Sequence, residues 1–281
     1  MSDNAWVEVR LSCPDSQQAR RFARRLKRGG ARHLLQKGLE LWSVWPDDQA
    51  SRQALAWLGE LDPPASLRAF RAVDALAAWS APQARPMGPG LALAGADSGL
   101  RAGPGLLIID ALTAFGAGDH PSTALNLELL CRLLSGQFGP PPPAGVWAAD
   151  IGAGTGVLAL AMALVGGLSV LAVDPEPAAR RACLRNIALN PLAGGRVHFV
   201  QARGDAVGGR FAVVAANLPT GLLLAIGDQI AALVADGGFV ALSGFRDEAV
   251  ESIAQIFTSA GLKPIATPSR HGWSGLLLSR Q

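Results

Sequence analysis

The chain has 281 residues, 49% of them hydrophobic, and a formal net charge of +3. This length suits one large domain or two smaller ones, with ample apolar residues for a buried core. The mildly basic pI of about 9.1 does not by itself indicate a nucleic-acid partner, so we expect no stable binding to nucleic acid. Because the chain has no tyrosine, a phenol is excluded as an acid, a base or a hydroxyl donor.

The cysteine pattern and the polar start of the chain restrict the class of protein further. The cysteines are too few and too widely spaced for a disulfide framework or a zinc cluster, so no metal site is expected: Cys13, Cys131 and Cys183. No apolar segment follows the polar first residues, so we expect no secretory signal and a cytoplasmic location. Residues 151–173 carry no charge, but five glycines interrupt them, which favours a buried strand-helix-strand unit over a membrane span.

The first 62 residues have the pattern of a small α/β domain. Residues 6–12 alternate between apolar and polar side chains, as in a half-buried strand. Asp15 or Ser16 can cap the helix that follows, on which Ala19, Phe22 and Leu26 form an apolar stripe. We expect extended segments at 32–37 and 39–45 and a second helix at 49–59. The tryptophans of this region are interpreted as core residues: Trp6, Trp42 and Trp45.

The first predicted helix is strongly basic. Residues 16–39 contain eight lysines and arginines and no acidic residue. Two interpretations stay open here. The charges can form an ordinary solvated helix face, or they can form a docking face for an acidic partner such as a ribosomal particle or an acidic protein.

A connecting segment rich in alanine, proline and glycine is predicted at residues 63–105. Residues 67–79 are compatible with a linking helix. The prolines exclude a long regular element in the rest of the segment: Pro82, Pro86, Pro89 and Pro104.

From residue 106 to residue 281, apolar strands alternate with helices. This order predicts a Rossmann-like α/β fold with a doubly wound, mostly parallel sheet of seven strands. The last two strands are close enough in sequence to form a hairpin, so the final strand should be antiparallel and lie at or near an edge. The expected strands are 106–109, 146–150, 169–173, 197–201, 211–215, 238–243, 263–267 and 275–279, and the expected helices are 122–134, 157–165, 177–189, 222–234 and 247–260.

A glycine-rich turn indicates a nucleoside site. The sequence D-I-G-A-G-T-G at residues 150–156 ends one strand and opens a helix, and Asp174 ends the next strand. In such layouts the glycines Gly152, Gly154 and Gly156 let a ligand approach the backbone, and the second acid holds ribose hydroxyls. A carboxylate at Asp150 would repel a pyrophosphate but suits the cationic groups of S-adenosylmethionine. We therefore favour S-adenosylmethionine over NAD or FAD.

Two further segments make the pattern specific. Residues 115–123 have the sequence F-G-A-G-D-H-P-S-T, and residues 214–221 have V-A-A-N-L-P-T-G. Together with the glycine turn, they resemble the PrmA family, the class I methyltransferases of ribosomal large-subunit protein eleven. The resemblance covers residues 110–281. It implies an S-adenosylmethionine-dependent methyltransferase that acts on lysine or α-amino groups of a ribosomal protein, free or in the large subunit.

The resemblance also implies roles for individual residues. The cofactor contacts of the family fall on Thr123, Gly152, Asp174 and Asn217. Thr123 would offer a hydroxyl to the methionine carboxylate and Asp174 would accept hydrogen bonds from the ribose. Asn217, at the lip of the sheet, would aim the acceptor amine at the methyl group. His120 is a second candidate catalytic residue.

Departures from the family pattern and simpler interpretations leave the acceptor open. The family has D-P-G where this chain has Asp110-Ala111-Leu112, and its G-T-G corresponds to Gly116-Ala117-Gly118. His120 could merely hydrogen-bond its own turn, and Asn217 could be a turn former. Asp174 could cap the next helix. Another protein, a small molecule or a nucleobase could be the acceptor, and a non-catalytic module that binds S-adenosylmethionine is a further alternative.

Overall fold

The computed structural model describes residues 5–31, 33–37, 39–46, 49–60, 66–71, 84–110 and 120–281. The chain divides into two compact units, Met1–Ala81 and Pro82–Gln281. The predicted limits of the domains and of the linker stay predictions. Most of the 115–123 motif, residues 115–119, lies outside the described residues.

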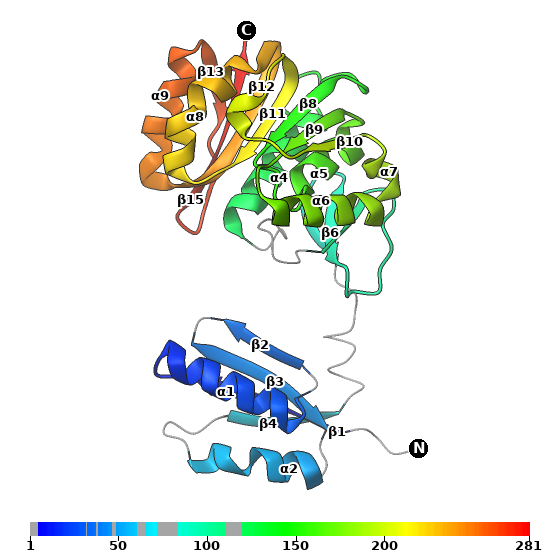
Figure 1. Ribbon diagram of the computed structural model, residues 1–281, viewed down its shortest axis with the longest axis vertical. Helices are drawn as coiled ribbons and strands as arrows, with labels where there is room; N and C mark the ends of the chain where they lie inside the picture. Colours follow the sequence, from blue (N-terminus) through cyan, green and yellow to red (C-terminus); the bar gives the residue numbers. More distant parts are fainter. Residues whose placement is uncertain are drawn as a thin grey trace. The chain divides into compact units, whose positions relative to one another are not determined.

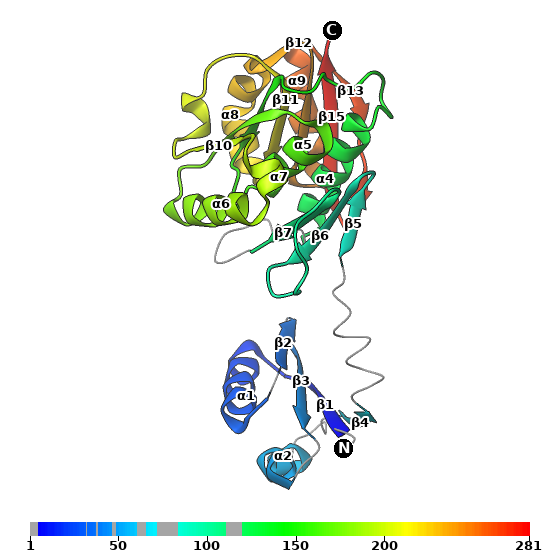
Figure 2. The same cartoon turned by 90° about the vertical axis from the view of Figure 1, so that its right-hand side faces the viewer.

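The first unit is a four-stranded antiparallel sheet with two helices on one face (Figure 2). The sheet order is β2-β3-β1-β4. With the chain order β-α-β-β-α-β, this is a ferredoxin-like topology, which fits the predicted small α/β domain. Its elements are β1 Ala5–Ser12, α1 Ser16–Gly29, β2 His33–Lys37, β3 Glu40–Pro46, α2 Gln49–Leu55, a 3-10 helix Ala56–Glu60 and β4 Ser66–Arg71.

Local sequence explains the start of α1 and the face that it buries. Asp15 accepts hydrogen bonds from the backbone N–H groups of Gln17 and Gln18, at 2.8 and 2.7 Å, and so satisfies two donors that the first turn leaves free. The predicted apolar stripe of α1 is buried against β1 and β3: Ala19, Phe22 and Leu26. Trp45 of β3 is buried in the same core. The side chains of Trp6 and Trp42 lie outside the described residues.

The prediction of a linking helix at 67–79 is wrong for residues 67–71, and residues 72–79 lie outside the described residues. Residues Ser66–Arg71 form β4, which pairs antiparallel with β1. The free edge of β1 supplies backbone hydrogen bonds in register, so tertiary pairing outweighs the weak local preference for a helix.

The second unit opens with a small three-stranded sheet, β5-β6-β7 (Figure 2). Its strands are β5 Arg85–Gly88, β6 Leu91–Gly95 and β7 Leu106–Ile109. Two of them fall within the predicted linker. Pro86 is tolerated because β5 is an edge strand, where a missing N–H donor leaves no gap in the sheet.

Two asparagines cover the outer edge of β7: one lies in α6 (Pro177–Leu189), and the other caps the C-terminal end of this helix. Asn190 accepts a hydrogen bond from Ile108 N at 2.8 Å and donates one to Ile108 O at 2.7 Å. Asn186 does the same with Asp110, at 2.8 and 3.1 Å, and also donates to Thr155 O at 3.0 Å. The two amides therefore act as a substitute strand and tie β7 to the glycine turn.

The main sheet has the order β10-β9-β8-β11-β12-β15-β13, with β14 paired to β15. This seven-strand path confirms the predicted sheet. The final strand, β15, is antiparallel and lies next to the edge strand β13, as predicted. The strands are β8 Trp147–Ile151, β9 Ser169–Val173, β10 Val197–Val200, β11 Phe211–Asn217, β12 Val234–Arg246, β13 Leu262–Ala266, β14 Ser269–Arg270 and β15 Trp273–Arg280.

Helices bury both faces of this sheet (Figure 1). Neighbouring residues of a strand belong to different cores: Ala148 and Val213 pack with α4 and α5, whereas Ala149 and Val214 pack with α8 and α9. Burial on both faces explains why the strands are continuously apolar. The helices are α4 Pro121–Leu134, α5 Val157–Gly166, α6, α7 Pro191–Gly194, α8 Thr220–Ala232 and α9 Val250–Ser259, and short 3-10 turns lie at Gly204–Ala206 and Asp247–Ala249.

The strand order reverses between β8 and β11. From β8 the chain continues to β9 on one side, while β11 lies on the other. Ligands of open α/β sheets bind at such a switch point, outside the carboxyl ends of the strands. Within the described residues, no helix is long and apolar enough to cross a membrane.

Candidate active site

A cavity of about 580 Å³ lies at the switch point. Its size is within the range of small-molecule sites. Six of the predicted site residues line it: His120, Thr123, Gly152, Gly154, Asp174 and Asn217. The wall is completed by neighbours of the predicted residues, Glu176, Leu218 and Pro219, and by two residues that the sequence did not indicate, Gly244 and Trp273.

The glycine turn is shaped by contacts that leave no room for side chains. Gly152 has φ 76°, and a Cβ there would collide with the side chain of Leu218. Gly156 has φ 78° and begins α5; a Cβ there would lie 2.5 Å from Cys183 Sγ. Gly152 therefore borders the cavity, whereas Gly156 lies outside its lining and sets the packing of α5 on α6. The predicted contact between Gly156 and the cofactor has no support from this geometry.

Asp174 holds the turn from the end of β9. Its Oδ2 accepts a hydrogen bond from Gly154 N at 2.9 Å, and its Oδ1 accepts one from Glu176 N at 2.9 Å. The carboxylate thus orders both the glycine turn and the segment before α6. Each oxygen keeps a further lone pair for a ligand hydroxyl. The capping and ligand-binding interpretations of Asp174 are compatible.

Asp150 does not lie at the mouth of the turn, which corrects its predicted position, while its contact with the cofactor stays a prediction. Its side chain is fully buried under the turn, and Oδ2 accepts a hydrogen bond from Ala159 N in α5, at 3.0 Å. Burial raises the pKa of this carboxyl, the hydrogen bond from Ala159 N lowers it in part and the charge of Asp174 adds to the rise, so that the pKa is about 7. The group fixes α5 to β8 from inside, and it is largely shielded from a ligand in the cavity.

Asn217 and Thr123 meet across the floor of the cavity, although 94 positions separate them in the sequence. Asn217 Nδ2 donates a hydrogen bond to Thr123 Oγ1 at 3.0 Å. Asn217 Oδ1 is buried and has no hydrogen-bond partner among the residues that the structure describes. Because a buried polar atom without a partner is costly, this oxygen is the clearest sign of a missing ligand donor.

A buried asparagine positions the first turns of α4. Asn126 Nδ2 lies 3.1 Å from Ala216 O, 3.3 Å from Ala241 O and 3.1 Å from Ser243 Oγ. These acceptors belong to the carboxyl ends of β11 and β12. The contact holds α4, and with it Thr123, against the lip of the sheet.

His120 caps α4. Its Nδ1 accepts a hydrogen bond from Ser122 N at 3.3 Å and lies 2.7 Å from Ser122 Oγ. The ring contacts Trp273 edge-on, with 4.5 Å between the centroids. Burial and the nearby charge of Arg246 hold the pKa of His120 below its usual value, so the ring is neutral at neutral pH. The structure therefore brings His120 to the cavity and supports the capping interpretation, while its catalytic role stays a prediction.

Trp273 is the main site residue that the sequence did not reveal. It follows a two-residue turn, His271-Gly272, in which both residues have positive φ, as a type I′ hairpin requires. The guanidinium of Arg246 lies over its ring, 4.2 Å from the centroid. An aromatic residue just after a predicted hairpin turn was the available sign.

The doubly wound sheet, the glycine turn at its switch point and Asp174 on the next strand define a class I methyltransferase fold. The crystal structure of the ribosomal protein L11 methylase from Lactobacillus delbrueckii subsp. bulgaricus superposes with a TM-score of 0.61. That comparison covers 71% of this chain and 99% of the other, at 24% sequence identity.

The family model of the ribosomal protein L11 methyltransferase (PrmA) matches residues 103–281. The chain belongs to this family of S-adenosylmethionine-dependent enzymes. The ribosomal protein L11 methyltransferase of Citrifermentans bemidjiense is 36% identical over 168 residues, 60% of this chain and 53% of that protein. The protein of the same name from Pseudomonas paraeruginosa is 35% identical over 167 residues, 59% and 53% of the two chains.

These comparisons confirm the predicted family and fold class, and the predicted enzyme class and cofactor are those of the family. The matches span only about half the length of the curated relatives.

Proposed function

We propose that this protein transfers a methyl group from S-adenosylmethionine to an amino group of a ribosomal protein. The buried Asn217 Oδ1 carries this proposal, because it is a hydrogen-bond acceptor for which the described part of the cavity wall supplies no donor. A lysine or α-amine can supply that donor.

The residues of the cavity fit the cofactor. Asp174 has lone pairs left for two ribose hydroxyls, and the turn at Gly152 and Gly154 exposes backbone to the ligand. Thr123 is close enough to Asn217 to orient it while its hydroxyl contacts the methionine end. When bound, S-adenosylmethionine supplies an electrophilic methyl group on a positively charged sulfur.

The residues of the cavity can prepare the acceptor amine. An unperturbed lysine has a pKa of about 10.4, so it must lose a proton before it can attack. An apolar wall with Leu218, Pro219 and Trp273, and the positive charge of Arg246 behind Trp273, both lower the pKa of a bound amine. Asn217 Oδ1 would then accept one remaining N–H and fix the direction of the lone pair. The catalytic role that we propose for His120 is to accept the proton that the amine loses.

The names of the relatives support a ribosomal protein as the substrate, either free or in the large subunit. We propose that the ferredoxin-like unit presents this substrate. A cytoplasmic location follows from such a substrate.

The test is transfer of tritiated methyl groups from S-adenosylmethionine to a cell lysate and to isolated large ribosomal subunits. We expect a labelled ribosomal protein; label in RNA, or no label, would contradict the proposal. Asn217→Ala should lower kcat by about tenfold or more, since orientation of the amine is lost. Thr123→Val keeps the Asn217 amide but removes its hydrogen-bond partner, and should lower kcat less. A loss below tenfold in Asn217→Ala would argue against the role of Oδ1.

A further inference from the structure

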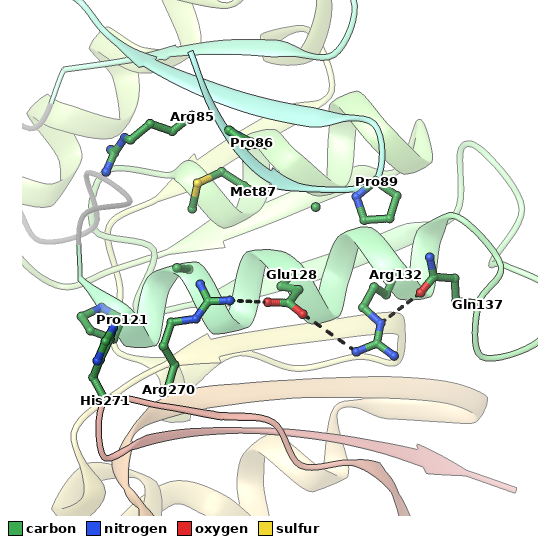
Figure 3. Close-up of a pocket in the computed structure, with 12 residues that line it drawn as sticks. Arg85, Pro86, Met87, Pro89, Pro121, Glu128, Arg132, Gln137, Arg270 and His271 are labelled. Carbon is green, nitrogen blue, oxygen red and sulfur yellow. Dashed lines mark hydrogen bonds and ion pairs between the residues drawn. The ribbon is translucent and has the colours of Figure 1, made fainter. Parts of the chain in front are cut away.

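A second hollow of about 530 Å³ lies on the surface beside α4 (Figure 3). Its floor is the one partly exposed stripe of this otherwise buried helix: Pro121, Ala124, Glu128 and Arg132. β5 with Pro89 forms one wall, and Arg270 and His271 of the β14–β15 hairpin form the other. We call this hollow the α4 groove. The mechanism proposed above does not use it.

The α4 groove is positively charged, because its lining includes three arginines and one glutamate. Glu128 lies between two of them: Arg270 Nη2 is 2.9 Å from its Oε2, and Arg132 Nη1 is 3.9 Å from its Oε1 (Figure 3). One carboxylate thus serves two guanidinium groups. Gln137 Oε1 accepts a hydrogen bond from Arg132 Nε at 3.0 Å and holds that side chain in place. The third arginine, Arg85, is exposed on β5.

The α4 groove lies next to the active-site cavity. Pro121 lines the groove, whereas the flanking His120 and Ser122 line the cavity. On the hairpin, His271 lines the groove and Trp273 lines the cavity. The first turn of α4 and the tip of the hairpin therefore form a shared rim, so one ligand could occupy both spaces.

We propose that the α4 groove binds an extended, acidic segment of the methyl-acceptor protein, adjacent to the amine that enters the cavity. This inference rests on the proposed function. Charge complementarity argues for acidic side chains, which would pair with Arg132 and Arg270. The eleven helical steps from Pro121 to Arg132 span roughly 16 Å, the length of about five residues in an extended chain. The acids of the substrate should therefore lie within about five positions of the modified residue.

The lining favours a peptide over a nucleic acid. Glu128 stands in the middle of the floor and would repel a continuous phosphate backbone. Among the described residues, no phenylalanine, tyrosine or tryptophan lines the groove as a stacking platform for a base. Pro86, Met87, Pro89 and Ala124 offer instead small apolar contacts between the charges.

The test uses the full chain with S-adenosylhomocysteine present and a fluorescein-labelled ten-residue peptide that carries one lysine and three glutamates. The matched peptide has three glutamines instead. Fluorescence anisotropy should show about tenfold tighter binding of the acidic peptide, as expected for two or three partly exposed charge pairs. In the Arg132→Gln/Arg270→Gln variant this preference should fall below about twofold. Arg196→Gln, which changes an exposed arginine at the opposite end of the parallel strands, should keep it.

A gain of affinity provides a test that unfolding cannot mimic. Glu128→Gln leaves both guanidinium groups available to the ligand, so the acidic peptide should bind about threefold more tightly. The proposal is overturned if the wild-type chain does not prefer the acidic peptide, if the preference survives in the double variant, if Glu128→Gln weakens binding, or if a ten-nucleotide RNA binds more tightly than the acidic peptide. Calorimetry with S-adenosylmethionine separates the two proposals. If the chain does not bind S-adenosylmethionine, the proposed function is refuted. The peptide titration, repeated without S-adenosylhomocysteine, still tests whether the α4 groove binds the acidic peptide.

Discussion

The active-site cavity and the α4 groove share a rim but are lined by different kinds of chemical group. The cavity is formed by backbone turns and short buried side chains, such as Gly152, Asp174 and Asn217. The groove is formed by long charged side chains on one helix and one hairpin. Its Glu128, Arg132 and Arg270 are 30%, 35% and 46% exposed.

This difference predicts how each region responds to change. In the cavity, close packing and buried hydrogen bonds leave few alternatives, so substitutions should cost stability or catalysis. In the groove, solvent screens the ion pairs, so substitutions should change the affinity for a partner and little else. The cofactor site is thus strongly constrained by the fold, while the groove can vary with the substrate.

The largest effect should come from Gly156→Val. A β-branched residue at φ 78° is strained, and its Cβ would lie 2.5 Å from Cys183 Sγ. The free energy of unfolding should fall by about 4 kcal/mol, from backbone strain and overpacking together. Urea denaturation measures it. Gly221→Val is the control, because a Cβ at Gly221 meets no atom within 4 Å. Equal losses in the two variants would show that the glycine turn is less constrained than we infer.

The next effect is the pH dependence caused by Asp150. Its pKa is about 7 in the folded protein, above the usual value near 3.9 of an unfolded chain. As the pH rises from about 4 to 7, the unfolded chain loses this proton and the folded chain keeps it, so stability falls; above pH 7 the loss is constant. Asp150→Asn, which resembles the protonated form, should lack this loss of about 2–4 kcal/mol. Denaturation at several pH values measures it, with the exposed Asp228→Asn as control. Parallel pH curves for wild type and Asp150→Asn would contradict the assignment.

The smallest effect should come from the hairpin that joins the two regions. Asp247 Oδ1 accepts hydrogen bonds from Ser274 Oγ at 2.6 Å and Ser269 Oγ at 2.8 Å, which hold the pKa of Asp247 below its usual value. Asp247→Ala should loosen the hairpin and weaken binding of the acidic peptide by about two- to fivefold, with the affinity for S-adenosylmethionine unchanged. Asp228→Ala serves as the control. A weaker affinity for the cofactor would mean that the rim supports the cavity more than the groove.

The main sheet could be predicted from sequence because strands that are buried on both faces are continuously apolar, and this pattern is easy to recognise. Continuous apolar strands alternate with helices, and Gly152 and Asp174 mark the carboxyl ends of β8 and β9. The small strands were harder to predict. β4 is a short edge strand whose partner, β1, is far away in the sequence, so local sequence does not show the pairing. β5 pairs with its neighbour β6, but Pro86 and Pro89 mask the pattern of a strand.

The candidate site was predictable where one residue type at one spacing implies one geometry. This holds for Gly152, Asp174 and the Asn217 motif. Asp150 shows the limit, because sequence does not determine whether a side chain at the end of a strand points to the lip or into the core. The pairing of Arg270 with Glu128, 142 positions away in the sequence, depends on tertiary structure alone.

The asparagine pair on the edge of β7 has a consequence for local opening of the chain. The amide protons of Ile108 and Asp110 are bonded to side chains at the end of α6, not to a neighbouring strand. Their exchange with deuterated solvent should therefore follow the detachment of α6 and not the separation of β6 from β7. Because Asn186 also donates to Thr155 O in the glycine turn, a ligand that steadies that turn should slow this exchange. The exchange rates of these two amide protons would then show whether the cavity is occupied, although neither residue lines it.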